Sequence, residues 1–280
     1  MKNILSILLV SALLIGCSEN RMLLEELTNK GTEESHIMYS ESGLFNGIGF
    51  DVYESGQLDL EINYKDGKRD GLHQEWYESG QLEYKWNYKD DKKDGLYQEW
   101  HESGQLYLEI NYKDGKKDGL YQKWYNSGQL YLEINYKDGE EDGLYQKWYN
   151  SGQLERKGNY VDGIINGLYQ EWHENGQLKT KENYKSGRED GIQKKWYKDG
   201  QIEYLATYIN GKEHGIQKLW YEDGQLEMEF VDGVKKNWNA NGQLVYENNE
   251  EYIYHKSYYR NGQPEFEHRY KTDQYFGYQA

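Results

Sequence analysis

The chain has 280 residues, a net charge of −16 and an aromatic-rich composition with 30 tyrosines and 9 tryptophans. The charge argues against a nucleic-acid-binding protein, which needs a basic face, and against docking on anionic lipid head groups. The aromatic content argues against a disordered chain. We therefore expect a folded protein with a thin aromatic core, whose acidic surface keeps it soluble or attracts a basic partner.

The first 16 residues differ from everything after them. Lys2 precedes an apolar run, residues 4–15, which is too short to span a bilayer as a helix and is typical of a secretory signal peptide. The run ends in Leu14-Ile15-Gly16-Cys17, which resembles the lipobox of bacterial lipoproteins. This resemblance implies a signal peptide over residues 1–16 and a lipid on Cys17. The protein would then be exported and anchored in the cell envelope, at the outer membrane if the cell is Gram-negative. A short uncleaved anchor is the alternative.

Three further segments follow the predicted signal peptide. Residues 17–40 are polar around an amphipathic piece, Met22 to Leu27, and are predicted to form a tether and an N-terminal cap. Residues 41–271 form a repeat array, and residues 272–280 a C-terminal tail. Within the array a phrase of 24 residues recurs, and a fixed period of this length indicates units that pack only on their neighbours.

One position of the phrase is a tryptophan, which we call the tryptophan row. It consists of Trp76, Trp100, Trp124, Trp148, Trp172, Trp196, Trp220 and, after a shortened interval, Trp238. We predict that this row is the structural core of the repeats. A second position, the tyrosine row, is predicted to point outward and to bind a partner. It consists of Tyr97, Tyr121, Tyr145 and Tyr169.

Each repeat is predicted to be a β-hairpin, with strands at residues 72–77 and 81–88 of the first full unit. The loop between them ends at Gly80, which suits a type I turn closed by a left-handed glycine with a G1 bulge. This three-residue loop places Trp76 opposite Leu82, whereas a two-residue loop would reverse the face of the tryptophan. The fold class that follows is all-β, an elongated antiparallel single-layer meander of stacked β-hairpin repeats.

Strict alternation along the strands predicts which residues share a face. The tryptophan face should then carry the apolar residues of the second strand, namely Leu82, Tyr84, Trp86, Tyr88 and their equivalents. The tyrosine row should share the opposite face with charged residues. The glycine of each Asp-Gly-Leu is expected to let an aromatic ring pack close to the backbone. Near the end of the array Pro264 is expected on an edge strand, where it would discourage end-to-end pairing.

The repeat also resembles a known family. The run from Asp118 to Leu130, followed by Tyr136-Lys137-Asp138-Gly139, is similar to the bacterial MORN-repeat variant, often grouped with the YwqK-type antitoxins. The resemblance covers about residues 41–270 and implies a curled single-layer sheet that serves in protein–protein contact. It also leaves open a toxin as the partner.

No pattern in the chain indicates catalysis. There is no HExxH motif, no pair of cysteines and no glycine-rich phosphate loop, so neither a metal site nor a cofactor is predicted. The seven histidines are interpreted as substitutes for tyrosine on a solvated face; they are His36, His73, His101, His173, His214, His255 and His268. The function predicted is a membrane-anchored, non-enzymatic repeat protein that binds a protein partner. The alternatives are an antitoxin or immunity protein and a cell-wall or carbohydrate-binding module.

Overall fold

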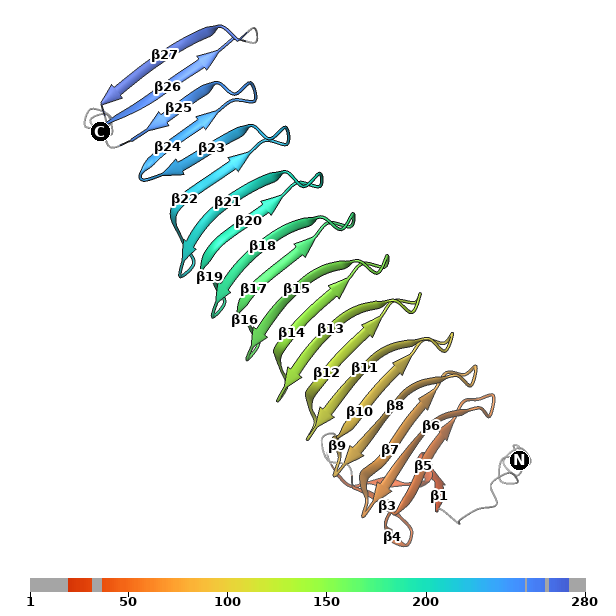
Figure 1. The fold of residues 1–280 in the computed structure, drawn as a ribbon. Coiled ribbons are helices and arrows are strands. Elements are labelled where there is room, and N and C mark those ends of the chain that lie inside the picture. The colour runs from red at the N-terminus through yellow and green to blue at the C-terminus, as the bar shows by residue number, and fades with distance from the viewer. Residues whose placement is uncertain (1–19, 32–36, 250, 260–261, 272–280) are drawn as a thin grey trace, which may run out of the picture. The chain divides into compact units, whose positions relative to one another are not determined.

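The computed structural model describes residues 20–31, 37–249, 251–259 and 262–271. The predicted signal peptide, Cys17, His36 and the predicted tail 272–280 lie outside these residues. The chain divides into two compact units, Met1–Glu140 and Glu141–Ala280. The strands of each unit are labelled in Figure 1. The part of the chain that the structure describes contains strands and one short 3-10 helix, which confirms the all-β fold class.

The first unit is a run of hairpins behind a small cap. Its elements are β1 (Arg21–Leu23), η2 (Leu24–Glu26), β2 (Thr28–Asn29), β3 (Met38–Ser40), β4 (Gly43–Leu44), β5 (Gly47–Val52), β6 (Leu58–Lys65), β7 (Lys68–Trp76), β8 (Leu82–Lys89), β9 (Lys92–Lys93), β10 (Gly95–Trp100), β11 (Leu106–Lys113), β12 (Lys116–Trp124) and β13 (Leu130–Lys137). Strands β5 to β8 and β10 to β13 pair antiparallel in chain order. Strand β1 lies parallel to β5.

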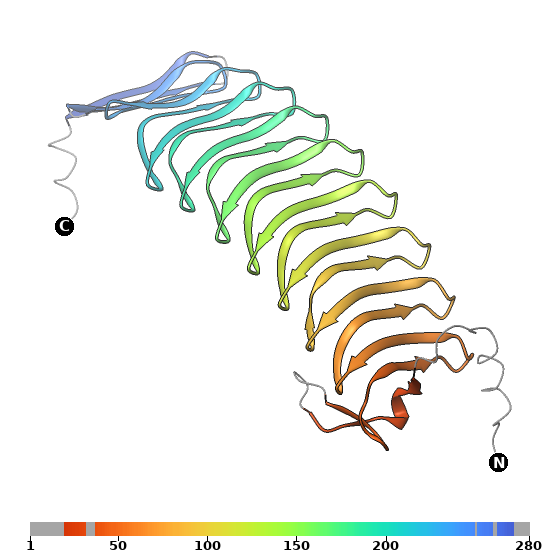
Figure 2. The same cartoon turned by 60° about the horizontal axis from the view of Figure 1, so that its bottom comes forward.

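The second unit repeats the same hairpin. Its strands are β14 (Glu140–Trp148), β15 (Leu154–Val161), β16 (Ile164–Ile165), β17 (Gly167–Trp172), β18 (Leu178–Lys185), β19 (Arg188–Glu189), β20 (Gly191–Trp196), β21 (Ile202–Ile209), β22 (Lys212–Trp220), β23 (Leu226–Val231), β24 (Val234–Trp238), β25 (Leu244–Asn248), β26 (Tyr252–Tyr258) and β27 (Pro264–Lys271). Figure 2 shows that the hairpins of each unit form a single layer.

The cap of the first unit holds an aliphatic and aromatic core. Leu27, Met38, Phe45 and Tyr64 are buried against one another, and Met22, Leu24 and Ile62 pack around them. The amphipathic segment after the predicted tether thus contributes three side chains to this core. Burying a side chain of this kind stabilises a fold by about 1.5–3 kcal/mol. The cap thereby stabilises the first repeat, as terminal caps do in repeat proteins.

The predicted turn is confirmed. The Tyr77 N–H donates to the Gln81 carbonyl at 2.9 Å, and the Gly80 N–H donates to the Tyr77 carbonyl at 2.8 Å. Gly80 has a φ of +85°, the left-handed conformation that closes a three-residue loop. At the opposite end of the hairpin Asp66 and Gly67 both have positive φ, at 51° and 78°. Two such residues between paired strands make a type I′ turn.

The predicted register beyond the turn is wrong. Trp76 lies opposite Leu82 as expected, but Glu75 lies opposite Tyr84 and His73 opposite Trp86. One residue of the second strand is therefore extra, which is a β-bulge. A shift of one residue moves every later side chain to the other face. Tyr84, Trp86 and Tyr88 consequently share a face with His73, and the tryptophan row does not.

The glycines of Asp-Gly-Leu also have a different role from the one expected. Gly71 has a φ of +108°, and a Cβ built on it would lie 3.1 Å from the Asn63 Cβ rather than against a ring. Here residues 70–72 oppose the single Asn63, whose side-chain N–H donates to the Leu72 carbonyl at 2.7 Å. Rings do pack on other glycines: that of Tyr64 lies 2.9 Å from the Cβ position of Gly49, and that of Tyr169 lies 3.0 Å from the Cβ position of Gly158.

Candidate functional site: two faces of the repeat sheet

The bulge gives each unit two faces of different character. We call the face that carries the tyrosine row the tyrosine face, and the one that carries the tryptophan row the tryptophan face. Apart from Ile48 of the first repeat, beside the cap, the buried strand residues of the repeats lie on the tyrosine face. In the first unit they are Gly49, Tyr64, His73, Trp86, Ile110 and Ile134, and in the second unit Gly158, Thr180, Gln193 and Ala206. The tyrosine face is therefore the protected one.

The tyrosines of the row pack against their neighbours. Tyr97 lies opposite Ile110, which is 1% exposed, and its ring meets that of Tyr112 edge-on with centroids 6.0 Å apart. Tyr121 meets Tyr136 in the same way at 5.9 Å. In the second unit the corresponding pairs are Tyr145 with Tyr160 at 5.8 Å and Tyr169 with Tyr184 at 6.3 Å. The structure thus places the whole row in ring contacts, half-buried, rather than pointing freely outward.

Cations cover the rings of the first unit. The Lys93 ammonium lies 4.1 Å from the centre of the Trp86 ring and 4.4 Å from that of Tyr97. The Lys117 ammonium lies 4.8 Å from the centre of the Tyr136 ring. Such contacts stabilise by about 0.5–2 kcal/mol, depending on how far the cation is desolvated. Burial lowers the pKa of Lys93, which reflects the partly desolvated position of its ammonium.

Burial also keeps the tyrosines neutral. It raises the pKa of Tyr121 to about 12, with smaller effects from neighbouring tyrosines and Glu99. It raises the pKa of Tyr97 as well. A general base or nucleophile needs a pKa close to the working pH, and these shifts run the opposite way. The tyrosine face is chemically suited to packing.

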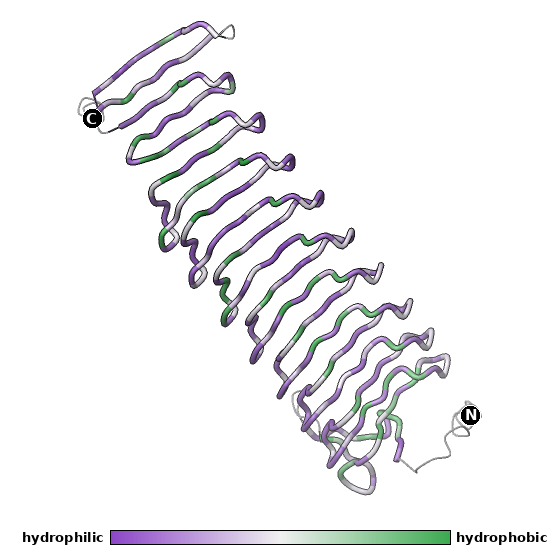
Figure 3. The backbone as a smooth tube through the Cα atoms, in the orientation of Figure 1, coloured by the Kyte–Doolittle hydropathy of each residue, from purple (hydrophilic) through white to green (hydrophobic). Residues whose placement is uncertain are grey.

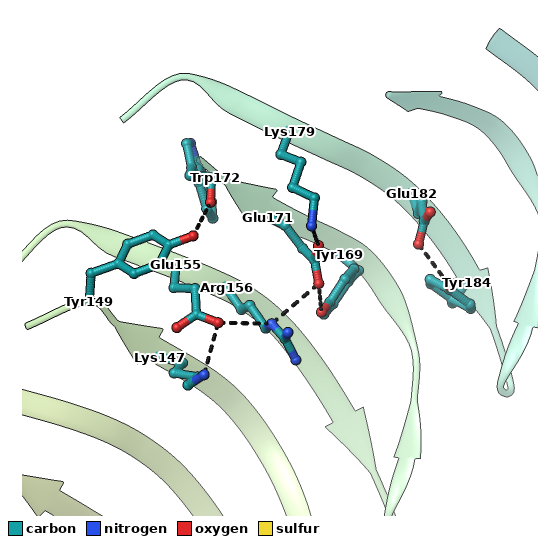
Figure 4. A network of polar contacts seen from close by, with 10 residues as sticks. All are labelled: Lys147, Tyr149, Glu155, Arg156, Tyr169, Glu171, Trp172, Lys179, Glu182 and Tyr184. Carbon is teal, nitrogen blue, oxygen red and sulfur yellow. Dashed lines mark hydrogen bonds and ion pairs between the residues drawn. The ribbon is translucent and has the colours of Figure 1, made fainter. Parts of the chain in front are cut away.

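In the second unit the same face carries a network of charges (Figure 4). Arg156 lies 3.3 Å from carboxylate oxygens of both Glu155 and Glu171. Lys147 reaches Glu155 at 2.8 Å, and the Tyr169 hydroxyl donates to Glu171 at 2.7 Å. Sequence reasoning missed this network, because Arg156 lies opposite Lys147, on the tyrosine face, only when the bulge is present.

His173 shows what the position after each tryptophan of the row requires. The Tyr149 hydroxyl donates to the Trp172 carbonyl at 2.8 Å, which ties the turn of one repeat to the next. His173 occupies the same position one repeat later, and its Nε2 lies 2.9 Å from the Trp196 carbonyl. The interpretation of His173 as a substitute for tyrosine is confirmed.

His73 does not lie on a solvated face. It is buried, its ring stacks on Trp86 with centroids 3.8 Å apart, and its Nε2 is 2.7 Å from Glu75. Burial lowers the pKa of His73 and outweighs the opposite effect of Glu75. The neutral imidazole is thus the form that fits this site.

The tryptophan face is more open. All eight tryptophans of the row are only partly buried. Beside them runs a row of exposed aliphatic side chains, which we call the aliphatic row; it consists of Leu96 and Leu120 in the first unit and Leu168, Ile192 and Ile216 in the second. Figure 3 shows apolar positions that recur in each repeat between hydrophilic ones. Sequence reasoning missed that this row is exposed, although the signal was available, because a leucine or isoleucine follows each of the recurring glycines Gly95, Gly119, Gly167, Gly191 and Gly215.

The aliphatic row contrasts with the polar residues between it and the tryptophans. The Gln98 side chain donates to Glu109 at 2.8 Å, and that of Gln122 donates to Glu133 at 2.8 Å. These cross-strand pairs satisfy the polar groups of the face within the sheet. The apolar side chains beside them have no such covering, since Ile192 is 51% and Ile216 is 42% exposed.

Neither a metal centre nor a membrane-spanning helix is found in residues 20–31, 37–249, 251–259 and 262–271. No group of three or more His, Cys, Asp or Glu side chains there could hold a metal ion. No helix of that part is long and apolar enough to cross a bilayer.

Comparisons with solved structures find distant likenesses. The chain is similar over 78% of its length to the crystal structure of TcdB2-TccC3, at 9% identity and a TM-score of 0.21. It is similar over the same share to the structure of TcdB2-TccC3-Cdc42, at 11% identity and a TM-score of 0.18. It spans 15% of the length of either matched chain. No curated protein matches it.

The repeat itself decides the family. The signature of the MORN repeat variant matches nine segments, which are residues 45–66, 69–90, 93–114, 117–138, 141–162, 165–186, 189–210, 213–230 and 254–272. These segments cover most of the hairpins described above, each from one strand across its turn to the next. The chain belongs to the MORN repeat variant family.

Proposed function

We propose that this chain is a membrane-anchored, non-enzymatic repeat protein that binds a protein partner on its tryptophan face. The observation that carries the proposal is the aliphatic row beside the tryptophans. In the second unit Leu168, Ile192 and Ile216 are 39%, 51% and 42% exposed, and they recur one repeat apart on one face. Exposed apolar rows of this kind mark interaction sites, and tryptophan is among the residues that contribute most at interfaces.

The two faces differ in how far their side chains are already engaged in contacts within the sheet. The rings of the tyrosine face are paired with one another and with cations, so a partner there would have to displace existing contacts. The tryptophan face satisfies its glutamines and glutamates internally and leaves its aliphatic side chains uncovered. A partner that covers them gains about 25 cal/mol for each Å² of apolar surface removed from water.

Capture from solubilised cell envelopes tests the proposed surface. The tagged full chain is compared with the double variant Ile192→Ser/Ile216→Ser and with Ile209→Ser. Ile209 is 47% exposed but lies beside the type I′ turn, outside the aliphatic row, so it controls for loss of an exposed isoleucine. We expect the same protein to be enriched by the wild type and by Ile209→Ser and lost with the double variant. Equal enrichment with all three would contradict the proposal.

The anchor is tested separately. The lipobox supports lipidation of Cys17, so the wild type should partition into the detergent phase of a Triton X-114 extract and take up labelled palmitate. Cys17→Ser should lose both properties. Label on the Cys17→Ser variant would remove the anchor from the proposal and leave the binding surface untouched.

The identity of the captured protein separates the alternatives. A toxin whose activity the full chain suppresses would make this an antitoxin or immunity protein, in line with the YwqK-type resemblance. Retention on purified peptidoglycan, with no protein captured, would support a cell-wall-binding module instead.

A further inference from the structure

The last strand of the array has an open edge. β27 (Pro264–Lys271) pairs antiparallel with β26 (Tyr252–Tyr258), and no strand of the described residues pairs with its other side. All eight residues of β27 are exposed. The first repeat is treated differently, because β5 is covered by β1 and by the cap core. An unprotected edge presents a row of free backbone N–H and C=O groups to other chains.

The hairpin fixes which backbone groups point outward. The Tyr259 N–H donates to the Gln263 carbonyl at 2.9 Å, so these two residues face each other. Backbone groups alternate in direction along a strand, so the backbone of Pro264 points to the open edge. Beyond the bulge opposite Ser257, the backbone N–H and C=O groups of Glu267, Arg269 and Lys271 point to that edge as well. Pro264 lacks an N–H where the edge faces solvent, which is where proline is tolerated.

The residues of β27 are complementary to those of a second, antiparallel copy of β27. In an antiparallel pair of two β27 strands with His268 on the two-fold axis, Glu267 lies opposite Arg269 of the partner subunit. In the same register Phe266 lies opposite Tyr270 of the partner subunit. Shifting that register by two residues in either direction brings two Glu267 or two Arg269 side chains together instead. Opposite charges and aromatic pairs across neighbouring strands stabilise the pairing, and like charges destabilise it.

A row of exposed rings lies along the same strand. Phe266 stacks on His268 with centroids 4.3 Å apart, and His268 stacks on Tyr270 at 5.5 Å. Phe266 and Tyr270 are among the most exposed large hydrophobic residues of this part of the chain. A second strand beside β27 would extend the sheet and bring another such row next to these rings.

We propose that β27 pairs antiparallel with β27 of a second copy of this chain, centred on His268. The contact is isologous, so each residue pair occurs twice about the axis. Pro264 and the bulge limit the regular ladder to the residues that follow them, which makes the pairing short. Pro264, which is expected from the sequence to discourage end-to-end pairing, therefore shortens this pairing rather than preventing it.

Sedimentation of the full chain over a range of concentrations tests the proposal, with charge variants of the edge. We expect a concentration-dependent dimer that Glu267→Arg and Arg269→Glu each weaken at least tenfold, because each creates two like-charge contacts. The combined variant Glu267→Arg/Arg269→Glu should restore the dimer. A wild type that stays monomeric, or single variants that dimerise like the wild type, would overturn the pairing.

Two controls separate the dimer from the hairpin itself. Glu267 also pairs with Lys256 of its own chain at 3.0 Å, so Lys256→Gln removes that ion pair without touching the edge. Lys218→Glu breaks the 2.6 Å pair with Glu229 on inner strands. Both should dimerise like the wild type. If Lys256→Gln weakened the dimer as much as Glu267→Arg does, the proposed contact would be excluded.

The register has its own readout. In the full chain carrying Cys17→Ser, His268→Cys would place two thiols directly opposite each other at the axis. Mild oxidation should then link the copies, while Tyr270→Cys in the same background should not be linked. Equal cross-linking by both variants, or none by His268→Cys, would reject this register.

Discussion

The two faces of each unit are built from neighbouring residues of the same strands, yet the side chains of one face are packed and those of the other are exposed. On the tyrosine face, residues such as Tyr97 and Ile110 pack on one another and on the Lys93 side chain. On the tryptophan face, Leu96 precedes Tyr97 in the chain and stays 37% exposed. A single-layer sheet has no second layer to cover it. Protection must therefore come from large side chains on the same face, and only one face has enough of them.

The bulge after each turn is the cause of this asymmetry. It sends the apolar second-strand residues to the face of the tyrosine row and leaves the tryptophans with the aliphatic row. The buried side chains and the proposed binding surface thereby lie on opposite faces of each unit. A substitution on the tyrosine face should change folding, and one on the tryptophan face should change recognition.

The largest effect is expected from Ile110→Ala. Ile110 is 1% exposed beneath Tyr97, so the change removes buried methyl groups and leaves a cavity. We expect a loss of about 2–4 kcal/mol in the free energy of unfolding. Urea unfolding followed by tryptophan fluorescence measures it. Leu96→Ala is the matched control, since Leu96 precedes Tyr97 but lies on the open face, and it should cost less than about 1 kcal/mol. Equal losses would show that the two faces are protected alike.

The hairpin loop could be predicted from the sequence, whereas the bulge could not. Ser79-Gly80 specifies a left-handed glycine by local chemistry alone. The bulge follows Leu82, where the sequence alternates apolar and polar residues as a regular strand would. Which face the later rings occupy is decided by packing between repeats, which no single hairpin reveals.

The ties between repeats should contribute less than the buried side chains. The Tyr77 hydroxyl donates to the Trp100 carbonyl at 2.9 Å, so Tyr77→Phe removes one hydrogen bond and no packing. We expect a loss of about 1 kcal/mol in the free energy of unfolding. Tyr107→Phe serves as the control, because no described group hydrogen-bonds its hydroxyl while its ring packs near His101. A loss with Tyr107→Phe as large as that with Tyr77→Phe would assign the effect to the ring environment instead.

A smaller effect should depend on pH. Burial lowers the pKa of His73, so the unfolded chain takes up its proton at a higher pH than the folded chain does. The contribution of His73 to stability is therefore fully present above its ordinary pKa of about 6.5 and is lost as the pH falls below it. His73→Tyr, which places there the residue found at Tyr97, should remove this loss. Unfolding at pH 7.5 and 5.5 measures it; an identical drop in both proteins would rule out His73 as the source.

The smallest effect is expected from the charge network of the second unit. Burial raises the pKa of Glu171, but the Tyr169 hydroxyl, Lys179 and Arg156 outweigh it and hold that pKa below its ordinary value. The stability gained from Glu171 is present above the usual carboxyl pKa and is lost as the pH falls through the lowered one.

Arg156→Gln should remove only part of this gain. The Arg156 side chain is 43% exposed, and water screens its ion pairs with Glu155 and Glu171. We expect a loss below about 1 kcal/mol at low salt that shrinks in 1 M NaCl, measured by urea unfolding at both salt concentrations. Lys157→Gln removes a neighbouring exposed cation on the tryptophan face and should show neither effect. If instead Arg156→Gln cost as much as Ile110→Ala, ion pairs would rank with buried side chains in protecting the tyrosine face.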